Sequence, residues 1–273
     1  MRLFVRGYGS GSKNYFKMPF ESFSIPIKSF SIFIPIYNEE TILISNISVI
    51  RDFLKQLNLI YEIILVSNGS TDQTNSLGSQ LASTYPEISF YTLNKKGIVG
   101  TAFKMAALHA KYPILINLDI DLPINLSFIP QALQSLESND IVIGAKILGF
   151  QNRHFIRKFG SWLYVRLANR FLKTNIQDFS SCGKAYRIDK IKPFLKNIGS
   201  GVSFCPVLLY LAENSGLRIH TVSVECLDQR KSKFGLVKLG FTMYKGLFSL
   251  FLLKRDKKST LKKLLFHEDS WDS

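Results

Sequence analysis

Apolar residues follow two alternating periodicities through the first half of the chain. Short runs rich in Ile, Val and Phe occupy residues 31–37, 61–66, 88–93 and 113–118. Between these runs, apolar side chains spaced three and four residues apart predict helices over residues 39–57, 71–85 and 101–111. Strands that alternate with helices are typical of an α/β domain with a largely parallel sheet.

The second half of the chain continues the alternation less regularly. Residues 140–147 form another apolar run, and residues 153–172 form a long basic helix candidate. An irregular segment at 178–184 follows, then a predicted helix at 204–215 and a predicted strand at 218–224. No internal repeat interrupts this order.

Polar residues stand directly after several of the predicted strands. In a parallel sheet, ligands bind beyond the carboxyl ends of the strands. We therefore expect the residues at these ends to converge on one edge of the sheet, which is the predicted active site. They are Asn38, Glu39, Asn68, Lys95, Lys96, Asp119 and Asp121.

Length and composition limit the class of protein. With 273 residues, of which 46% are hydrophobic, the chain suits one large domain or two small ones, and wholesale disorder and fibrous folds are excluded. Cys182, Cys205 and Cys226 are too few and too scattered for a disulfide framework, and the four histidines have no metal-ligand spacing. A reducing cytoplasmic setting is expected.

Charge divides the chain into two parts. Residues 1–145 hold 11 basic and 11 acidic side chains, so the net charge of +15 lies entirely in residues 146–273, which hold 24 basic and 9 acidic ones. A neutral half joined to a basic half indicates an anionic partner for the second half.

The segment Asp119-Ile120-Asp121 is the strongest candidate for chemistry. Two carboxylates one residue apart, where a strand ends, can both reach one Mg²⁺ or Mn²⁺ ion, which prefers oxygen ligands and shares them with a diphosphate. The alternative is a solvated turn, because Asp-x-Asp is a short motif.

Five segments together resemble a known family. They are residues 34–40 (IPIYNEE), 62–74 (EIILVSNGSTDQT), Asp119 to Asp121, 140–146 and 178–184 (DFSSCGK). In this order and spacing they are similar to family 2 glycosyltransferases with the GT-A fold, most of all to the branch of dolichyl-phosphate and polyprenyl-phosphate mannose and glucose synthases. The resemblance covers about residues 30–235.

The resemblance implies a nucleotide site with a divalent metal ion. Asp119 and Asp121 would hold Mg²⁺ or Mn²⁺ with the donor diphosphate. The remaining nucleotide-binding residues would be Pro35, Tyr37, Glu39, Asn68, Lys96, Arg230 and Lys233. The family usually has two aspartates where this chain has Ser67 and Asn68, so Asn68 would meet the base through an uncharged amide.

The resemblance also implies an acceptor site. The basic residues in the segment that approaches the acceptor phosphate are Lys146, Arg153, Arg157 and Lys158. Asp178 would orient the acceptor, or act as a base if the acceptor were a hydroxyl. Its alternative role is structural, either capping Ser180 or Ser181 or pairing with Arg187. Cys182 is expected to be a packing residue.

The two ends of the chain differ from the domain between them. Residues 1–29 are interpreted as a loose leader and residues 30–233 as the GT-A domain. Residues 234–253 are predominantly apolar, with two charged residues, Lys238 and Lys245, and a polybasic cluster follows. This pattern favours an amphipathic tail, residues 234–273, that lies on an anionic membrane surface. The alternative is a helix packed on the domain, followed by a solvated charged segment.

These features predict an enzyme at the cytoplasmic face of a membrane. It would move a sugar, with inversion, from a UDP- or GDP-sugar to a polyprenyl phosphate. A second hypothesis keeps the donor but transfers to a hydroxyl of a glycan or of a lipid-linked saccharide. A third is a non-catalytic basic module that binds membrane surfaces. Nucleic acid is not an expected partner, because the basic residues are not interleaved with a surface of stacking aromatics.

Overall fold

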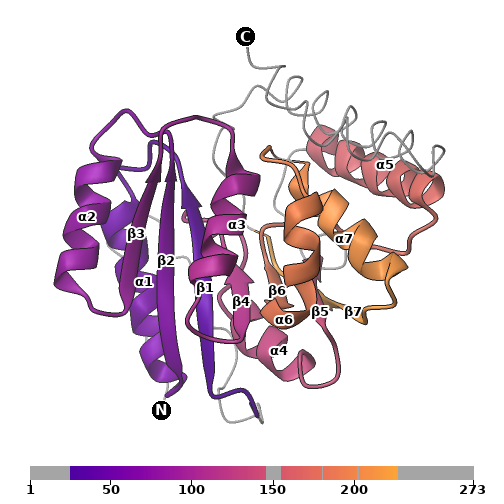
Figure 1. The fold of residues 1–273 in the computed structure, drawn as a ribbon, viewed down its shortest axis with the longest axis horizontal. Coiled ribbons are helices and arrows are strands. Elements are labelled where there is room, and N and C mark those ends of the chain that lie inside the picture. The colour runs from indigo at the N-terminus through magenta and orange to yellow at the C-terminus, as the bar shows by residue number, and fades with distance from the viewer. Residues whose placement is uncertain (1–24, 146–154, 180, 202, 227–273) are drawn as a thin grey trace.

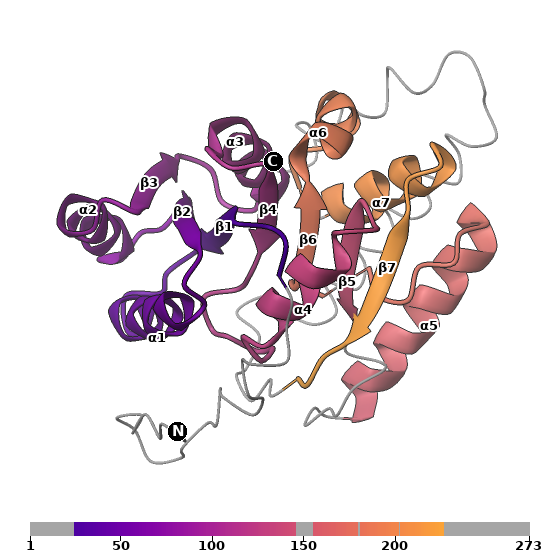
Figure 2. The same ribbon diagram turned by 90° about the horizontal axis from the view of Figure 1, so that it is seen from below.

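The computed structural model describes residues 25–145, 155–179, 181–201 and 203–226 (Figure 1). The tail predicted to bind membranes lies outside these residues, as do most of the leader and the candidate residues Lys146, Arg153, Arg230 and Lys233. The described residues form one seven-stranded sheet with helices on both of its faces (Figure 2).

The first half has the predicted alternation of strands and helices. The strands are β1 (Ser29–Ile36), β2 (Ile60–Asn68), β3 (Ile88–Leu93) and β4 (Ile114–Asn117). The helices are α1 (Leu43–Gln56), α2 (Thr74–Thr84) and α3 (Val99–His109). The second half contains α4 (Phe128–Ser135), β5 (Ile141–Ala145), α5 (Phe155–Leu172), β6 (Lys184–Arg187), α6 (Ile188–Ile191), a 3₁₀ helix (Lys192–Asn197), α7 (Phe204–Asn214) and β7 (Ile219–Ser223).

The order of strands across the sheet is β3-β2-β1-β4-β6-β5-β7. All neighbouring pairs are parallel except those of β6, which runs antiparallel between β4 and β5. The prediction of a largely parallel sheet is therefore confirmed. The carboxyl ends of six strands and the amino end of β6 consequently share one edge, which we call the carboxyl rim.

The alternation of side chains in β1 explains why the sheet needs two helical layers. Ile32, Ile34 and Ile36 belong to a core cluster with α1 and α4, whereas Phe33 belongs to a second cluster with α3, α5 and α7. Successive side chains of a strand point to opposite faces, so an unbroken apolar run must be covered on both faces.

Four elements were not predicted from the sequence: α4, β6, α6 and the 3₁₀ helix at Lys192–Asn197. The α4 helix is only eight residues long, and its buried residues include Pro130 within the first turn. The β6 strand has four residues and begins with a lysine that the sequence reading assigned to an irregular loop. All four are short elements that depend on the segments packed against them, so local pattern is a weak signal for them.

Candidate active site

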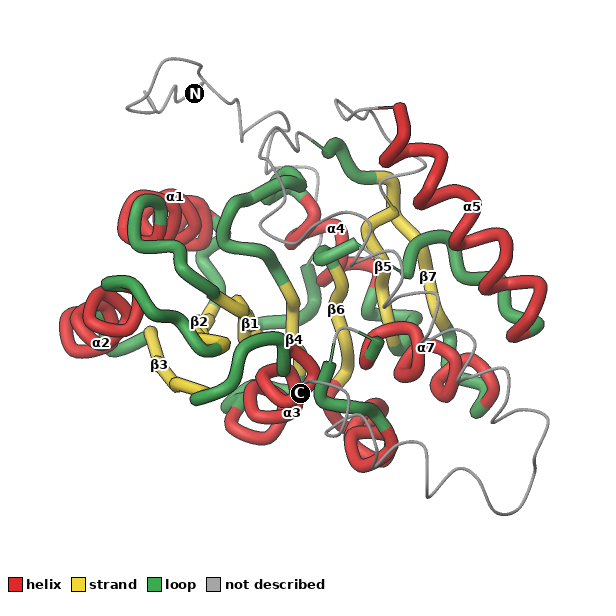
Figure 3. The backbone as a smooth tube through the Cα atoms, turned by 90° about the horizontal axis from the view of Figure 1, so that it is seen from above, coloured by secondary structure: helices red, strands yellow, loops and turns green. Residues whose placement is uncertain are grey.

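The parallel strands bring the loops that carry the predicted site residues to the carboxyl rim, and Figure 3 shows these loops from above. Pro35 lies opposite Val66 in the pairing of β1 with β2, and Asn117 of β4 lies opposite Lys184, the first residue of β6. The loops after β1, β2, β3 and β4 and the loop before β6 are therefore neighbours. The convergence expected from the sequence is confirmed for the described residues.

The loops after β1 and β2 are joined by reciprocal hydrogen bonds. The backbone N–H of Thr71 donates to Oδ1 of Asn38 at 2.8 Å, and the N–H of Asn38 donates to Oγ of Ser70 at 3.1 Å. The N–H of Glu39 donates to Oγ1 of Thr74 at 2.8 Å. Asn38 has a φ of 51°, a conformation that asparagine tolerates better than most residues. This geometry places Glu39, which is buried, beside the start of α2.

Asn68 connects the end of β2 to the loop before α3. Its Oδ1 accepts a hydrogen bond from the N–H of Ile98 at 3.1 Å. Gly69 follows with a φ of +75°, and a Cβ there would lie 2.7 Å from the backbone nitrogen of Lys96. The two loops thus approach each other so closely that a side chain at position 69 does not fit.

Tyr37 and Lys96 face each other above the rim. The ammonium of Lys96 lies 4.4 Å from the centre of the Tyr37 ring, which is a cation–π contact. Both residues were predicted to line the nucleotide site. A half-buried aromatic ring and an exposed cation at the mouth of a loop cluster suit a base and its phosphates, respectively.

Asp119 and Asp121 lie in a turn just after β4. The N–H of Leu122, which has a φ of 49°, donates to the carbonyl of Asp119 at 3.1 Å. Ile120 between them is buried, and its carbonyl accepts a hydrogen bond from Nδ2 of Asn46 at 2.8 Å. Anchoring Ile120 on α1 leaves both carboxylates half-exposed at the rim.

The oxygen chemistry of this turn fits a divalent cation. Within the part of the chain that is described, no group of three or more His, Cys, Asp or Glu side chains is arranged to hold a metal ion. Asp119 and Asp121 would therefore supply two ligands and leave further positions for diphosphate oxygens and water. That distribution suits Mg²⁺ or Mn²⁺, which are bound by few carboxylates together with substrate phosphates.

Asp178 occupies a buried loop at the same rim. It is 2% exposed, and its Oδ1 accepts a hydrogen bond from the N–H of Ser181 at 2.9 Å. The ammonium of Lys184 is also buried and donates to the carbonyls of Phe179 (3.2 Å) and Ser181. Capping of Ser181, which the sequence left open as the structural role of Asp178, is thus present in the structure.

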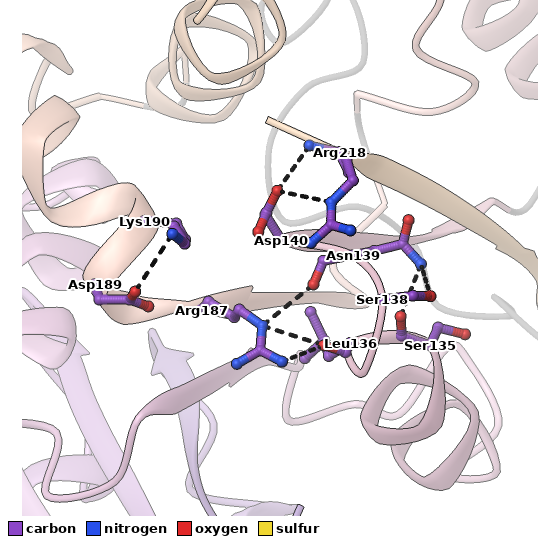
Figure 4. Close-up of polar contacts among 9 residues, drawn as sticks. All are labelled: Ser135, Leu136, Ser138, Asn139, Asp140, Arg187, Asp189, Lys190 and Arg218. Atoms are coloured by element: carbon purple, nitrogen blue, oxygen red, sulfur yellow. Dashed lines mark hydrogen bonds and ion pairs between the residues drawn. The ribbon is translucent and has the colours of Figure 1, made fainter. Parts of the chain in front are cut away.

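The other structural role considered for Asp178, a pair with Arg187, is wrong. Arg187 lies at the opposite end of β6, where its guanidinium donates to the carbonyls of Leu136 and Asn139 (Figure 4). Asp140, at the same end, accepts from the N–H of Arg218 at 2.9 Å. This network therefore lies at the end of the strands opposite the carboxyl rim.

Buried groups near Lys184 complete the surroundings of the Asp178 loop. Sγ of Cys205 lies 3.5 Å from the carbonyl oxygen of Phe179. Burial raises the pKa of the Cys205 thiol, although Lys184 nearby acts in the opposite direction. Cys182 is also buried, in the other core cluster, as expected for a packing residue. Neither thiol has the environment of a nucleophile.

Sequence reasoning did not single out Asn117 or Ser181 as site residues. Oδ1 of Asn117 and Oγ of Ser181 are buried without a hydrogen-bond partner among the described residues. Both belong to segments at the rim. A polar residue at the end of an otherwise apolar strand was the available signal for Asn117.

The acceptor residues are only partly placed. Arg157 and Lys158 lie in the first turn of α5, and Lys146 and Arg153 lie outside the described residues. Among the helices of the described chain, none has the length and apolar character needed to cross a membrane.

The chain matches the model of glycosyl transferase family 2 over residues 31–194. This match covers more than half of the chain and includes every strand of the rim from β1 to β6. The protein belongs to glycosyl transferase family 2, and it is a glycosyltransferase with a GT-A-like α/β fold.

Curated relatives are found among bacterial transferases. The undecaprenyl-phosphate 4-deoxy-4-formamido-L-arabinose transferase of Serratia proteamaculans is 29% identical over 224 residues, covering 80% of this chain and 67% of the relative. That of Photorhabdus laumondii is 28% identical over 220 residues, covering 80% and 66%. The chain therefore spans about two thirds of the length of these relatives.

Solved structures share the fold. Glucosyl-3-phosphoglycerate synthase from Mycobacterium tuberculosis, in complex with Mn²⁺, uridine diphosphate and phosphoglyceric acid, superposes with a TM-score of 0.62 at 19% identity, covering 84% of this chain and 78% of that one. The same synthase with Mn²⁺ and uridine-diphosphate-glucose gives a TM-score of 0.61 at 18% identity, covering 84% and 79%.

Proposed function

We propose that this glycosyltransferase transfers a sugar from a nucleotide diphosphate to a polyprenyl phosphate, with inversion at the anomeric carbon. The observation that carries the proposal is the meeting of the Asp119–Asp121 turn with the loops after β1, β2 and β3 at one rim. The names of the curated relatives, which act on undecaprenyl phosphate, support this choice of acceptor.

The chain's own residues would position the donor. Tyr37 and Lys96 would meet the base and the phosphates, while Pro35, Glu39 and Asn68 shape the pocket behind them. Asp119 and Asp121 would hold a divalent cation, which neutralises negative charge on the leaving diphosphate. Arg230 and Lys233, which follow the described residues, are proposed to contact the same diphosphate. The solved neighbours that contain Mn²⁺ and uridine diphosphate support a donor of this kind.

The reaction needs no strong base. An acceptor phosphate is already anionic at neutral pH, so its oxygen can attack the anomeric carbon directly. A bond forms between that carbon and the acceptor oxygen, and the bond to the donor diphosphate breaks. Basic residues must hold two phosphate groups that repel each other, and we assign this task to Lys146, Arg153, Arg157 and Lys158.

Asp178 then has a positioning role in this proposal. A general base must reach the proton that it removes, and a carboxylate that is 2% exposed and bonded to the N–H of Ser181 is poorly placed to do so. Its burial therefore favours the phosphate acceptor over the alternative of a glycan or lipid-linked hydroxyl. Under this proposal the enzyme works peripherally at the cytoplasmic face of a membrane.

The test is a transfer assay with the purified full chain. UDP- and GDP-sugars would be incubated with Mn²⁺ and undecaprenyl phosphate, and extracted lipid would be treated with mild acid. A sugar phosphodiester releases its sugar under these conditions, whereas a glycoside formed on a hydroxyl resists them.

Asp119→Asn is the matched variant. We expect kcat to fall by a factor of about 10² or more, because a metal ligand is lost, with unchanged thermal unfolding. An acid-stable lipid product would contradict the phosphate acceptor. Retention of full activity by Asp119→Asn would contradict the assigned metal site.

A further inference from the structure

The α5 helix has two chemically distinct faces. Tyr164, Val165, Ala168 and Leu172 are buried in the core cluster beneath the helix. On the other side, three exposed residues follow one another at intervals of four: Trp162, Arg166 and Arg170. Such spacing places them on one face of an α-helix. We call these three residues the α5 outer face. Lys173, which is also exposed, lies just beyond the end of the helix.

Trp162 is the aromatic member of the four large apolar side chains that are exposed among the described residues, and it is 45% exposed. The guanidinium of Arg166 lies 5.3 Å from the centre of its ring, so the exposed aromatic is flanked by positive charge. A tryptophan with cationic neighbours is suited to the boundary between lipid headgroups and acyl chains, where one part of the side chain is apolar and another is wet.

The charged side chains of the segment that contains α5 have a single sign. Between Asp140 and Asp178 the sequence contains seven basic residues and no acidic one. Glu213 of α7 lies near the carboxyl end of the helix, where its Oε1 accepts a hydrogen bond from the N–H of Asn175 at 3.0 Å. The segment that contains α5 therefore has a net positive charge, which attracts anionic partners.

The position of α5 relates this face to the active site. The helix lies between the carboxyl end of β5 and the loop of Asp178, both of which belong to the carboxyl rim. In Figure 1 it crosses the upper right of the molecule, at the edge toward which β2 and β3 point. A flat surface bound by the outer face would thus lie next to the rim.

We propose that the α5 outer face docks on an anionic lipid bilayer, with Trp162 entering the headgroup region. Charge complementarity with acidic headgroups and the exposed ring of Trp162 beside Arg166 carry this assignment. The contact is made by described residues of α5, and it does not depend on which acceptor the enzyme uses. It would orient the carboxyl rim toward the membrane surface.

Tryptophan fluorescence tests this directly. The chain has two tryptophans, Trp162 and Trp271, so the full-length Trp271→Phe variant reports on Trp162 alone. It would be mixed with vesicles of phosphatidylglycerol and brominated phosphatidylcholine that contain no polyprenyl phosphate and no donor. We expect a blue shift and quenching by the brominated chains, and neither with vesicles of phosphatidylcholine alone.

Two double variants in this background distinguish a specific contact from overall charge. Arg166→Glu with Arg170→Glu should raise the lipid concentration needed for half-maximal quenching by about tenfold or more, because two positive charges at the surface become negative. Lys192→Glu with Lys196→Glu changes the net charge equally, at exposed sites on the 3₁₀ helix, and should leave quenching unchanged. Circular dichroism would verify that each variant is folded.

Several outcomes would overturn the proposal. Sedimentation with the vesicles without quenching of Trp162 would place membrane binding elsewhere in the chain. If the two double variants lost quenching to the same extent, the contact would depend on net charge alone and not on the α5 outer face. A response of Trp162 to single-stranded RNA but not to vesicles would assign the face to nucleic acid. Because the assay omits substrates, its result is independent of failure of the transfer assay.

Discussion

Oδ1 of Asn68 accepts a hydrogen bond from the N–H of Ile98 at 3.1 Å, and this bond joins the carboxyl end of β2 to the loop that precedes α3. The amide oxygen proposed to meet the base of the donor is therefore already bonded within the protein. A carbonyl oxygen has two lone pairs, so a second bond from the base is compatible with the first. The conformation of the loop before α3 and the binding of the donor base would thus depend on the same amide oxygen.

Two replacements of Asn68 should therefore have opposite effects on donor binding. Asn68→Ala removes both bonds and should raise the donor KM by about tenfold, whereas Asn68→Asp provides a charged acceptor and should lower it by a few fold. Steady-state kinetics with the donor that the enzyme turns over would measure this. Asn94→Ala, at an exposed position after β3, is the control and should have no effect. An unchanged donor KM in both Asn68 variants would contradict the role.

Gly69 and Gly97 provide a matched pair for the close approach of the two loops. Both have positive φ, but a Cβ at Gly69 would lie 2.7 Å from the backbone of Lys96, whereas one at Gly97 would have nothing within 4 Å. Gly97→Ala should cost about 1 kcal/mol of unfolding free energy through backbone strain alone. Gly69→Ala should cost more, about 2–4 kcal/mol, because backbone must move as well. Urea unfolding would compare them, and equal losses would contradict the clash.

The carboxylate of Asp72 makes the β1 and β2 loops sensitive to acid. Partial burial acts to raise the pKa of Asp72. Hydrogen bonds from Thr74 and from the N–H of Glu40 act to lower it, and their combined effect is larger, so the pKa lies below its usual value. Since the folded pKa is depressed, the stabilisation is present above the unfolded pKa of about 4 and is lost as pH falls through the folded value. The difference in unfolding free energy between the parent and Asp72→Asn should thus be largest near neutral pH. A difference that grows on acidification would contradict this.

Lys184 holds the Asp178 loop through two backbone carbonyls. Lys184→Met keeps much of the side-chain volume but leaves the carbonyl of Ser181 without this buried donor and the carbonyl of Phe179 with only the weak thiol donor of Cys205. We expect a loss of about 2–3 kcal/mol in unfolding free energy, the cost of unsatisfied buried acceptors. Lys190→Met, at an exposed position on α6, should change stability little. Thermal unfolding of both variants tests this, and similar midpoints would exclude the loop-holding role.

The fold was largely predictable where the pattern was long and regular. The strand expected at residues 88–93 is β3 to the residue, and the helix expected at 204–215 is α7, which ends at Asn214. The helix expected from residue 71 begins at Thr74, because Asp72 is used to accept the N–H of Thr74 just before the first turn. Extended apolar runs and helical spacing are signals that local sequence carries by itself.

The candidate site was predictable as a set of positions, and less so as a set of contacts. The order of strands and polar residues along the chain is enough to predict that Asn38, Asn68 and Asp119 share a rim. The contacts of the site residues depend on the folded chain: Asn68 bonds to Ile98, thirty residues away, and Asp178 caps Ser181 below the surface.

The same division explains the short elements. The β6 strand exists because its four residues are hydrogen-bonded between β4 and β5, and this pairing places Lys184 in the protein interior. Periodicity is a property of neighbouring residues in one segment, so it identifies strands and helices one at a time. Burial of a charge, the partner of a side-chain oxygen and the orientation of a short strand depend on segments that meet only after folding.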